Sequence, residues 1–148
     1  MISNPALPPQ RMMTETVLVV DDSITLRQTL ALTFEKAGYR VLQARDGREA
    51  IEQLQKNSAV INLVVCDVEM PNMNGFEFLS QRRQDPVISK PPVIMLTSRS
   101  SDKHRMLAKQ LGAREYFTKP YIEQEFLTAI SNIIKQESSS GVPALSGR

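Results

Sequence analysis

The sequence predicts an α/β domain in which five parallel strands form one sheet with helices on both faces. Short apolar runs of four or five residues alternate five times with longer amphipathic segments. Alternation of this kind is typical of a doubly wound sheet, in which a helix crosses from each strand to the next. The chain has 148 residues, of which 41% are hydrophobic and 23% charged. One domain with a substantial core is therefore expected.

The strands are predicted from apolar runs rich in valine, isoleucine and aromatic residues. The first run, VLVV, contains no polar residue, which is typical of a strand buried on both faces. The second run ends in QARDG without a distinctive side chain, which favours a place at the edge of the sheet. The predicted strands are residues 17–20, 40–44, 62–66, 92–96 and 115–118.

The helices are predicted from apolar residues at helical spacing and from the residues that begin and end helices. Leu26, Leu30 and Phe34 share one face of the first helix, and Gly38 ends it. Asp22 or Ser23 is the expected N-cap. The remaining predicted helices cover residues 47–56, 75–83, 102–112 and 122–135.

The two ends of the chain differ in composition from the middle. Residues 1–14 include NPALPPQ and are expected to be a flexible, Pro-rich lead-in, and residues 137–148 a flexible tail rich in Ser, Gly and Pro. The domain is predicted to span residues 15–136. The sequence has no stretch apolar and long enough to cross a bilayer and no signal-peptide pattern. A cytoplasmic protein without membrane contact is therefore expected.

The residues that follow the apolar runs are chemically reactive types. Asp21 and Asp22 follow the first run, Asp67 the third, Thr97 the fourth and Lys119 the fifth. Because ligand sites in open parallel sheets lie at the carboxyl ends of the strands, these side chains are expected to share one rim.

Three carboxylates at one rim favour a divalent cation. Two carboxylates about 5 Å apart repel by roughly 3 kcal/mol at an effective dielectric constant near 20. Carboxylate and carbonyl oxygens are the ligands that Mg²⁺ prefers, and Mn²⁺ accepts the same donors. A cation, an ammonium and a hydroxyl that face a carboxylate suit a phosphoryl group carried as an aspartyl phosphate.

The motifs VLVVDDS, VVCDVEMPNMNG, VIMLTS and YFTKP resemble the receiver domain of two-component response regulators over residues 15–136. The resemblance implies a flavodoxin-like (βα)5 fold with sheet order 2-1-3-4-5. It implies that Asp67 accepts a phosphoryl group from a histidine kinase or histidine phosphotransfer domain. The implied Mg²⁺ (or Mn²⁺) ligands are Asp21, Asp22, Asp67 and the backbone carbonyl of Glu69.

The resemblance also implies how the phosphoryl group is held and sensed. Thr97 and Lys119 are expected to contact its oxygens, and Tyr116 is expected to turn inward as Thr97 moves. A cis peptide is implied between Lys119 and Pro120. The implied chemistry is self-catalysed phosphoryl transfer and autodephosphorylation, not the turnover of a separate substrate.

The implied output is a change in protein–protein contacts. The fourth helix, fifth strand and fifth helix form the expected partner face, and no DNA-binding segment is expected after residue 136. This region carries six basic residues, which favour an acidic partner or a weak dimer, although a solvated helix face is the plain alternative. The six are Arg99, Lys103, Arg105, Lys109, Arg114 and Lys119.

A finer resemblance supports an alternative role. EMP, TSRSSDKHR and KPYIEQEF are similar to the receiver of chemotaxis-type hybrid histidine kinases. The alternative function is therefore a docking module or phosphate sink detached from such a kinase. A docking module that takes no phosphate is disfavoured because every position of the acceptor set is present.

Other functions fit the residues less well. An FMN carrier would place Asp21 and Asp22 against the ligand phosphate, and an aspartate-nucleophile phosphatase would need an aspartate where Glu69 stands. Neither GxGxxG nor GxxxxGK[ST] occurs, which disfavours a nucleotide site. MPNMNG also reads as a simple turn in which Gly75 has a positive φ. Glu69 and Arg99 are predicted to meet across the mouth of the site and slow hydrolysis, or else to be two solvated side chains.

Overall fold

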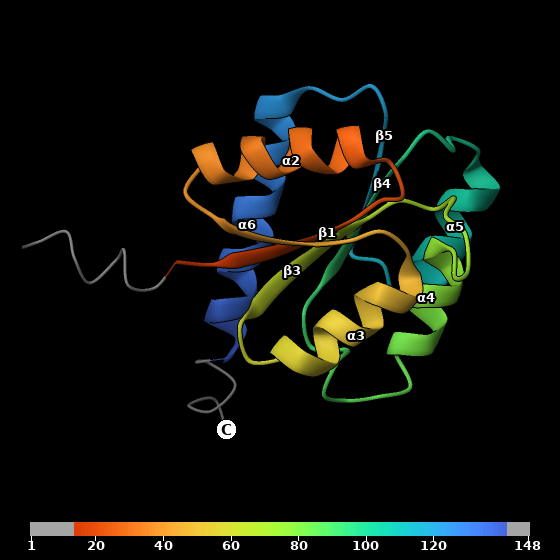
Figure 1. Ribbon diagram of the computed structural model, residues 1–148, viewed down its shortest axis with the longest axis horizontal. Coiled ribbons are helices and arrows are strands. Elements are labelled where there is room, and N and C mark those ends of the chain that lie inside the picture. The colour runs from red at the N-terminus through yellow and green to blue at the C-terminus, as the bar shows by residue number, and fades with distance from the viewer. Residues whose placement is uncertain (1–13, 142–148) are drawn as a thin grey trace, which may run out of the picture.

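The computed structural model describes residues 14–141 and contains one five-stranded parallel sheet (Figure 1). The strand order is β2-β1-β3-β4-β5, and each neighbouring pair is parallel. The predicted fold class and sheet order are thus confirmed. The strands are β1 (Thr16–Val20), β2 (Arg40–Ala44), β3 (Ile61–Cys66), β4 (Val93–Thr97) and β5 (Glu115–Thr118). The helices are α2 (Ile24–Lys36), α3 (Gly47–Asn57), α4 (Gly75–Arg82), α5 (Asp102–Gln110) and α6 (Glu123–Gly141).

The burial of each strand follows its place in the sheet. Every residue of β1 is buried, as the apolar first run predicts, because β1 pairs with β2 on one side and β3 on the other. β2 lies at an edge, as predicted, and its residues are exposed or half-buried except for Ala44. The predicted strand limits differ from the observed ones by one residue at most.

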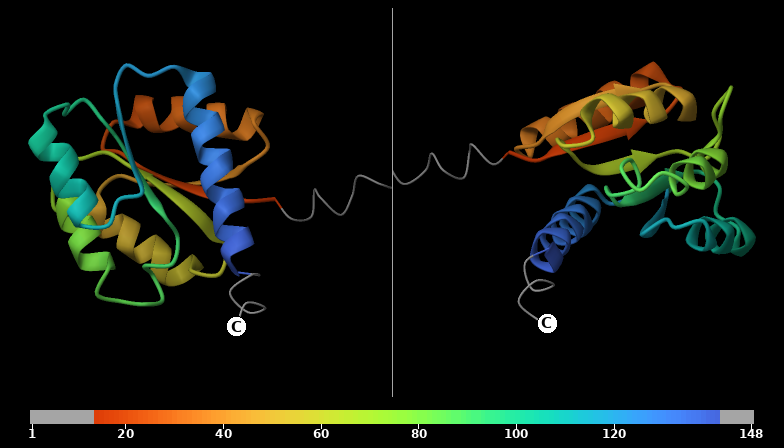
Figure 2. Two further views of the ribbon diagram at one scale, coloured as in Figure 1. Left: turned by 180° about the vertical axis from the view of Figure 1, so that it is seen from behind. Right: turned by 90° about the horizontal axis from the view of Figure 1, so that it is seen from below.

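Helices cover both faces of the sheet (Figure 2), and an apolar layer lies beneath them on each face. One layer joins α2 and α6 to the sheet through Leu30, Phe34, Phe126 and Ile130. The other joins α3, α4 and α5 to the opposite face and includes Leu54, Phe78, Leu79 and Ala108. The helices thereby hold the sheet from both sides and leave the carboxyl ends of its strands for the site.

The helix ends are set by short-range side-chain and backbone features. Ser23, one of the two predicted N-caps of α2, accepts a hydrogen bond from the backbone N–H of Leu26 at 3.2 Å. Gly38 follows α2 with φ 100°, a conformation that glycine adopts without steric cost. Within the part of the chain that the structure describes, no helix combines the length and apolar character needed to cross a membrane.

Helix α6 is longer than the sequence predicts. It continues to Gly141, so residues 137–141 are helical rather than part of a flexible tail. An ion pair between Arg114 Nη1 and Glu137 Oε2, at 2.5 Å, holds the start of this extension. The rest of the predicted tail (142–148) and residues 1–13 of the predicted lead-in lie outside the described residues.

The turn after β3 uses a different residue from the one predicted. The positive φ falls on Asn72, at 63°, and Gly75 is not among the described residues with positive φ. Asparagine tolerates this region because its short polar side chain bonds locally. Gly75 is needed for another reason, since a Cβ there would lie 2.3 Å from the carbonyl oxygen of Asp67. The glycine lets α4 begin directly against the end of β3.

Candidate phosphoryl and metal site

Three carboxylates meet at the carboxyl edge of the sheet. Asp21 and Asp22 follow β1, and Asp67 follows the neighbouring strand β3. One oxygen of each carboxylate lies within 4.8 Å of the others. Asp21 is buried, with 3% of its surface exposed, whereas Asp67 is half-buried and Asp22 is exposed. The order of the strands thus brings together residues 45 or more positions apart in the sequence.

The backbone holds Asp21 in place. Its N–H donates to the carbonyl of Ala44 at 3.1 Å, and its own carbonyl accepts from Arg27 Nη1 at 2.7 Å. Its Oδ1 accepts from the N–H of Ser23 at 2.9 Å. These contacts fix one carboxylate oxygen and leave Oδ2 to face Lys119.

Asp67 is held in the same manner one strand away. Its N–H donates to the carbonyl of Val20 at 3.0 Å, and its Oδ1 accepts from the N–H of Val68 at 2.6 Å. The backbone therefore fixes this side chain before any ligand contacts it.

Lys119, which follows the outer strand β5, brings a positive charge to the acidic cluster formed by Asp21, Asp22 and Asp67. Its Nζ lies 3.3 Å from Asp21 Oδ2 and 3.7 Å from Asp67 Oδ2. Its backbone N–H donates to the carbonyl of Thr97 at 2.8 Å, which ties the end of β5 to the end of β4. The implied cis peptide between Lys119 and Pro120 is confirmed.

The acidic cluster is electrostatically strained even with this lysine. Burial raises the pKa of Asp21, and the charge of Asp67 adds to the rise. The N–H of Ser23 and the ammonium of Lys119 oppose it without cancelling it, so the pKa remains above its ordinary value. A further positive charge would stabilise the ionised form of the cluster.

The donor set fits a hard divalent cation. The oxygens of Asp21, Asp22 and Asp67 are of the type that Mg²⁺ and Mn²⁺ prefer, and they lie close enough together to share one ion. The backbone carbonyl of Glu69, two residues after Asp67, is the further ligand that the sequence predicts.

Thr97 and Tyr116 both bind the backbone of Arg99. Thr97 is buried at the end of β4, and its Oγ1 accepts from the N–H of Arg99 at 3.2 Å. The Tyr116 hydroxyl donates to the carbonyl of Arg99 at 2.7 Å. The Arg105 guanidinium lies over the Tyr116 ring, 5.2 Å from its centroid. The two predicted switch residues are therefore linked through a single loop residue.

The predicted meeting of Glu69 and Arg99 is confirmed as an ion pair between Arg99 Nη2 and Glu69 Oε2. Both side chains are exposed, and both line a hollow that also includes Phe76 and His104. The pair bridges the loop after β3 and the loop after β4.

Several basic residues of the predicted partner face form ion pairs within the chain. Arg99 pairs with Glu69, Arg114 with Glu137, and Lys119 with the acidic cluster. Much of the basic character in this region therefore serves contacts within the chain.

Sequence reasoning missed the residues that hold the loops of the site. Asp46 N-caps α3 by accepting from the N–H of Glu49, and its other oxygen accepts from Asn72 Nδ2 at 2.7 Å. The pattern Asp-x-x-Glu at residues 46–49 is a capping signal and indicates the first contact. No local pattern indicates the second, which joins residues 26 positions apart.

Comparisons with known proteins agree with this geometry. Residues 17–131 match the response regulator receiver domain family. The chain is 37% identical to the transcriptional regulatory protein CpxR homolog of Haemophilus influenzae, over 83% of this chain and 52% of the relative. It is 34% identical to the sensor histidine kinase CheAY of Helicobacter pylori, over 82% of this chain and 15% of that protein. The chain therefore spans about half of the first relative and a small part of the second.

A solved structure shows the same fold at similar identity. The chemotaxis protein CheY4 of Vibrio cholerae is 37% identical, with a TM-score of 0.74 over 81% of this chain and 98% of CheY4. The strand order, the acidic triad at the carboxyl edge and the family match over most of the chain agree with one another. This chain belongs to the response regulator receiver domain family of two-component signalling.

Proposed function

We propose that this receiver domain accepts a phosphoryl group on Asp67 from the phosphohistidine of a histidine kinase or histidine phosphotransfer domain. The observation that carries the proposal is the meeting of three carboxylates with one ammonium at the mouth of a buried sheet. Lys119 Nζ lies 3.3 Å from Asp21 and 3.7 Å from Asp67. This arrangement supports a site built to receive positive charge and a phosphoryl group together.

In the proposed transfer, a carboxylate oxygen of Asp67 attacks the phosphorus atom. The bond between phosphorus and the imidazole nitrogen breaks, and its electron pair returns to the imidazole. The N–H of Val68 holds the carboxylate in a fixed orientation, and Lys119 and the Thr97 hydroxyl receive the phosphoryl oxygens. Positioning and charge neutralisation of this kind account for most of the catalysis in phosphoryl transfer.

Asp21, Asp22, Asp67 and the carbonyl of Glu69 would hold Mg²⁺ or Mn²⁺. When bound, the ion supplies positive charge that offsets the repulsion among the carboxylates and the incoming phosphoryl group. The raised pKa of Asp21, caused by burial and by the neighbouring Asp67, supports this role. The later loss of the phosphoryl group to water returns the protein to its first state without turnover of a separate substrate.

The proposed output is a change at the face formed by α5, β5 and α6. Thr97 and Tyr116 hold opposite sides of the Arg99 backbone unit, so a shift of Thr97 toward the phosphoryl group would move the acceptor of the Tyr116 hydroxyl. Tyr116 would then repack beside Arg105 on α5. A protein partner that binds the two arrangements unequally would read the difference, and a weak dimer through this face would be affected in the same way.

Intact-mass analysis tests the proposal directly. The full chain is incubated with a small-molecule phosphodonor and Mg²⁺, beside Asp67→Asn and the matched control Asp102→Asn, whose carboxylate is exposed at the start of α5. We expect the mass of one phosphoryl group on the wild type and on Asp102→Asn. We expect none on Asp67→Asn and none when a chelator removes the metal.

A histidine-phosphorylated kinase serves as the second donor, because some receivers respond only to their own kinase. A phosphoryl group on Asp67→Asn with either donor would contradict the assignment of Asp67. No phosphoryl group on the wild type with any donor would instead indicate a docking module.

A phosphate sink detached from a hybrid histidine kinase is the second candidate. The similarity to CheAY, which is named a sensor histidine kinase and of which this chain covers 15%, supports it. A sink would accept the phosphoryl group without changing its affinity for any partner. Binding of candidate partners to the phosphorylated and unphosphorylated chain separates the two roles.

A further inference from the structure

One short segment, residues 44–47, contacts both loops that carry the acidic residues. At its first residue, the carbonyl of Ala44 accepts from the N–H of Asp21 at 3.1 Å. At its last, the N–H of Gly47 donates to the carbonyl of Met73 at 2.9 Å. The segment therefore spans from the loop after β1 to the loop after β3, and it adds a second link between these loops beside the direct pairing of β1 with β3.

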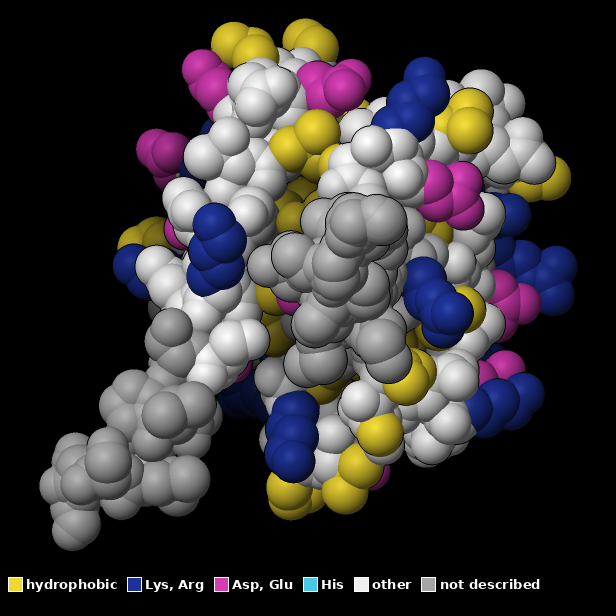
Figure 3. All heavy atoms as spheres, turned by 90° about the vertical axis from the view of Figure 1, so that its left-hand side faces the viewer, with side chains coloured by type: hydrophobic (Ala, Val, Ile, Leu, Met, Phe, Trp, Pro, Cys, Tyr) yellow, Lys and Arg dark blue, Asp and Glu magenta, His cyan; other side chains and the backbone are white. Residues whose placement is uncertain are grey.

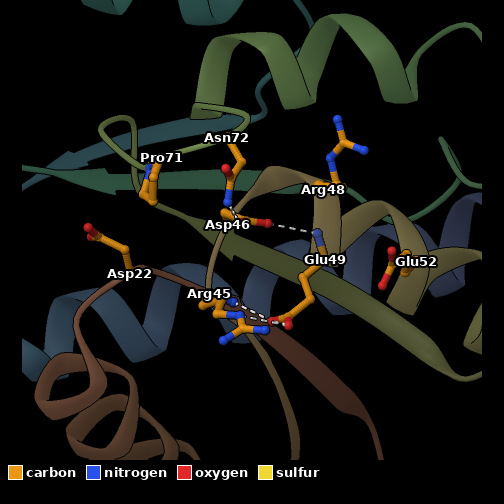
Figure 4. A pocket seen from close by; sticks show the side chains of 8 residues that line it. All are labelled: Asp22, Arg45, Asp46, Arg48, Glu49, Glu52, Pro71 and Asn72. Carbon is orange, nitrogen blue, oxygen red and sulfur yellow. Dashed lines mark hydrogen bonds and ion pairs between the residues drawn. The ribbon is translucent and has the colours of Figure 1, made fainter.

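The Asp46 carboxylate is the side-chain contact between this segment and the loop after β3. Its Oδ1 accepts from the N–H of Glu49, and its Oδ2 accepts from Asn72 Nδ2 at 2.7 Å. Only 5% of the residue is exposed. In Figure 4, the Asn72 side chain points at Asp46 across one wall of a hollow that Asp22 also lines. Both oxygens are thus used by protein donors.

The loop after β3 is tightly folded where Asn72 joins it. Asn72 has φ 63°, and the N–H of Met73 bonds the carbonyl of Pro71 at 2.6 Å. A Cβ on Gly47 would lie 2.7 Å from the Met73 side chain, so helix and loop are in close contact. These contacts make the loop compact, and Glu69 lies at its beginning.

We propose that Asp46 and Asn72 are positioning residues that set the Mg²⁺ affinity of the acidic cluster without touching the ion. Their hydrogen bond holds the segment between Asp67 and Gly75 against the start of α3, and through Ala44 at a fixed distance from Asp21. The inference rests on the proposed function, because it concerns the same cation. Partners that orient metal ligands from behind commonly change metal affinity by about 10- to 100-fold when they are removed.

The charge on Asp46 strengthens this role. Burial alone would raise its pKa, but hydrogen bonds from Asn72 and from the N–H groups of Glu49 and Arg48 hold the pKa below its ordinary value. The carboxylate is therefore ionised at neutral pH, and its bond to the Asn72 amide is a charge-assisted hydrogen bond, which is stronger than one between neutral groups.

The test is calorimetric titration of the full, unphosphorylated chain with MgCl₂. Asn72→Gly removes the amide while it still permits positive φ, and we expect it to weaken Mg²⁺ binding about tenfold. Asn62→Ala is the matched control, because Asn62 Oδ1 accepts from the N–H of Thr16 at 2.8 Å and joins β3 to β1 at the opposite end of the same strands. We expect this control to bind Mg²⁺ as the wild type does, even where both variants melt at lower temperature.

A reciprocal exchange tests the bond itself. The double variant Asp46→Asn with Asn72→Asp reverses donor and acceptor, keeps the α3 cap and leaves the net charge unchanged. We expect its Mg²⁺ affinity to return to within about threefold of the wild type, a free-energy difference of roughly 0.7 kcal/mol or less. A positioning bond predicts this recovery, whereas a requirement for Asp46 as such does not.

Three results would overturn the inference while the proposed function stands: wild-type affinity in Asn72→Gly, equal weakening in Asn62→Ala, or no recovery in the double variant. A wild-type chain that binds no Mg²⁺ would instead contradict the proposed function. The same titration therefore separates the two failures.

Discussion

Buried charge has different partners at the two ends of the strands, here called the amino edge and the carboxyl edge of the sheet. At the amino edge, the buried Arg82 at the end of α4 donates from Nη2 to the carbonyls of Ser89 at 3.2 Å and Pro91 at 3.0 Å. At the carboxyl edge, Asp21 and Asp67 face each other with only Lys119 between them. Figure 3 faces the side where the strands begin, and Lys and Arg side chains are spread over it with Asp and Glu between them.

This difference indicates that the amino edge contributes to stability, whereas the carboxyl edge is arranged for function. At the amino edge, Arg82 ties the end of α4 to the carbonyls of Ser89 and Pro91, although burial lowers the pKa of its guanidinium. At the carboxyl edge, three carboxylates share one ammonium and so carry excess negative charge. Like charges this close disfavour the folded state until a cation binds. Removing a buried charge should therefore lower stability at the amino edge and raise it at the carboxyl edge.

The largest loss of stability is expected from Arg82→Met. Methionine fills much of the same volume but leaves the carbonyls of Ser89 and Pro91 without their donor. We expect the free energy of unfolding to fall by about 2–4 kcal/mol, measured by urea denaturation. The control is Arg83→Met, because Arg83 is exposed and donates to the carbonyl of Gln110. A loss below about 1 kcal/mol for Arg82→Met would remove the contrast between the edges.

Gly75→Ala should be nearly as destabilising, at about 2–3 kcal/mol, since its Cβ would press on the carbonyl of Asp67. The backbone at the end of β3 must then move, so we also expect weaker Mg²⁺ binding by calorimetry. Gln81→Ala, on an exposed position of the same helix, is the control and should leave both quantities unchanged. Normal Mg²⁺ affinity in a destabilised Gly75→Ala would mean that the loop accommodates the methyl group away from the site.

The strands and the residues that follow them could be predicted from the sequence because both depend on local pattern. Apolar runs locate the strands, and parallel pairing sends their carboxyl ends to one rim, which predicts that Asp21, Asp67 and Lys119 lie close together, as they do in the structure. The contacts between loops could not be predicted. The bond from Asn72 to Asp46 depends on how two distant turns meet, and short side-chain pairs of this kind leave no periodic signal.

The same limit explains the errors at turns and helix ends. The sequence predicts positive φ at Gly75, the residue most tolerant of it, but the positive φ falls on Asn72, and the glycine is needed instead for close packing against Asp67. Helix α6 was expected to end where its apolar residues end. It continues to Gly141, and Arg114, brought near by the tertiary fold, pairs with Glu137 at the start of this extension.

Asp67→Asn should raise the free energy of unfolding, whereas Arg82→Met and Gly75→Ala should lower it. Removing one of three like charges relieves repulsion, partly offset by the lost contact with Lys119, and we expect a stabilisation of about 1 kcal/mol in the presence of a chelator. For a domain of this size the melting temperature should rise by a few degrees. Mg²⁺ binding should weaken at the same time. A lower melting temperature without metal would contradict the description of the cluster as strained.

The pH dependence of stability should reveal how much the ionisation of Asp21 contributes to the strain in the acidic cluster. Burial, and then the charge of Asp67, raise its pKa above 3.8, so the folded protein binds this proton more tightly than the unfolded chain. The contribution is therefore favourable at low pH and is lost as pH rises through the raised pKa. Compared with Asp21→Asn in chelator, the wild type should lose relative stability as the pH rises above about 4. Parallel curves for the two proteins would show that Asp21 titrates normally.

Arg99→Ala should have the smallest effect on stability, within about 0.5 kcal/mol, because the ion pair with Glu69 is exposed. Its effect should appear in the lifetime of the phosphoryl group, with hydrolysis about two- to threefold faster by intact-mass decay, equivalent to roughly 0.5 kcal/mol of barrier. Lys103→Ala, on the exposed side of α5, is the control. The backbone groups of residue 99 still bind Thr97 and Tyr116 in the variant. A faster rate would therefore come from opening the mouth of the site and not from disturbing the switch, and an unchanged rate would show that water reaches Asp67 by a path the pair does not cover.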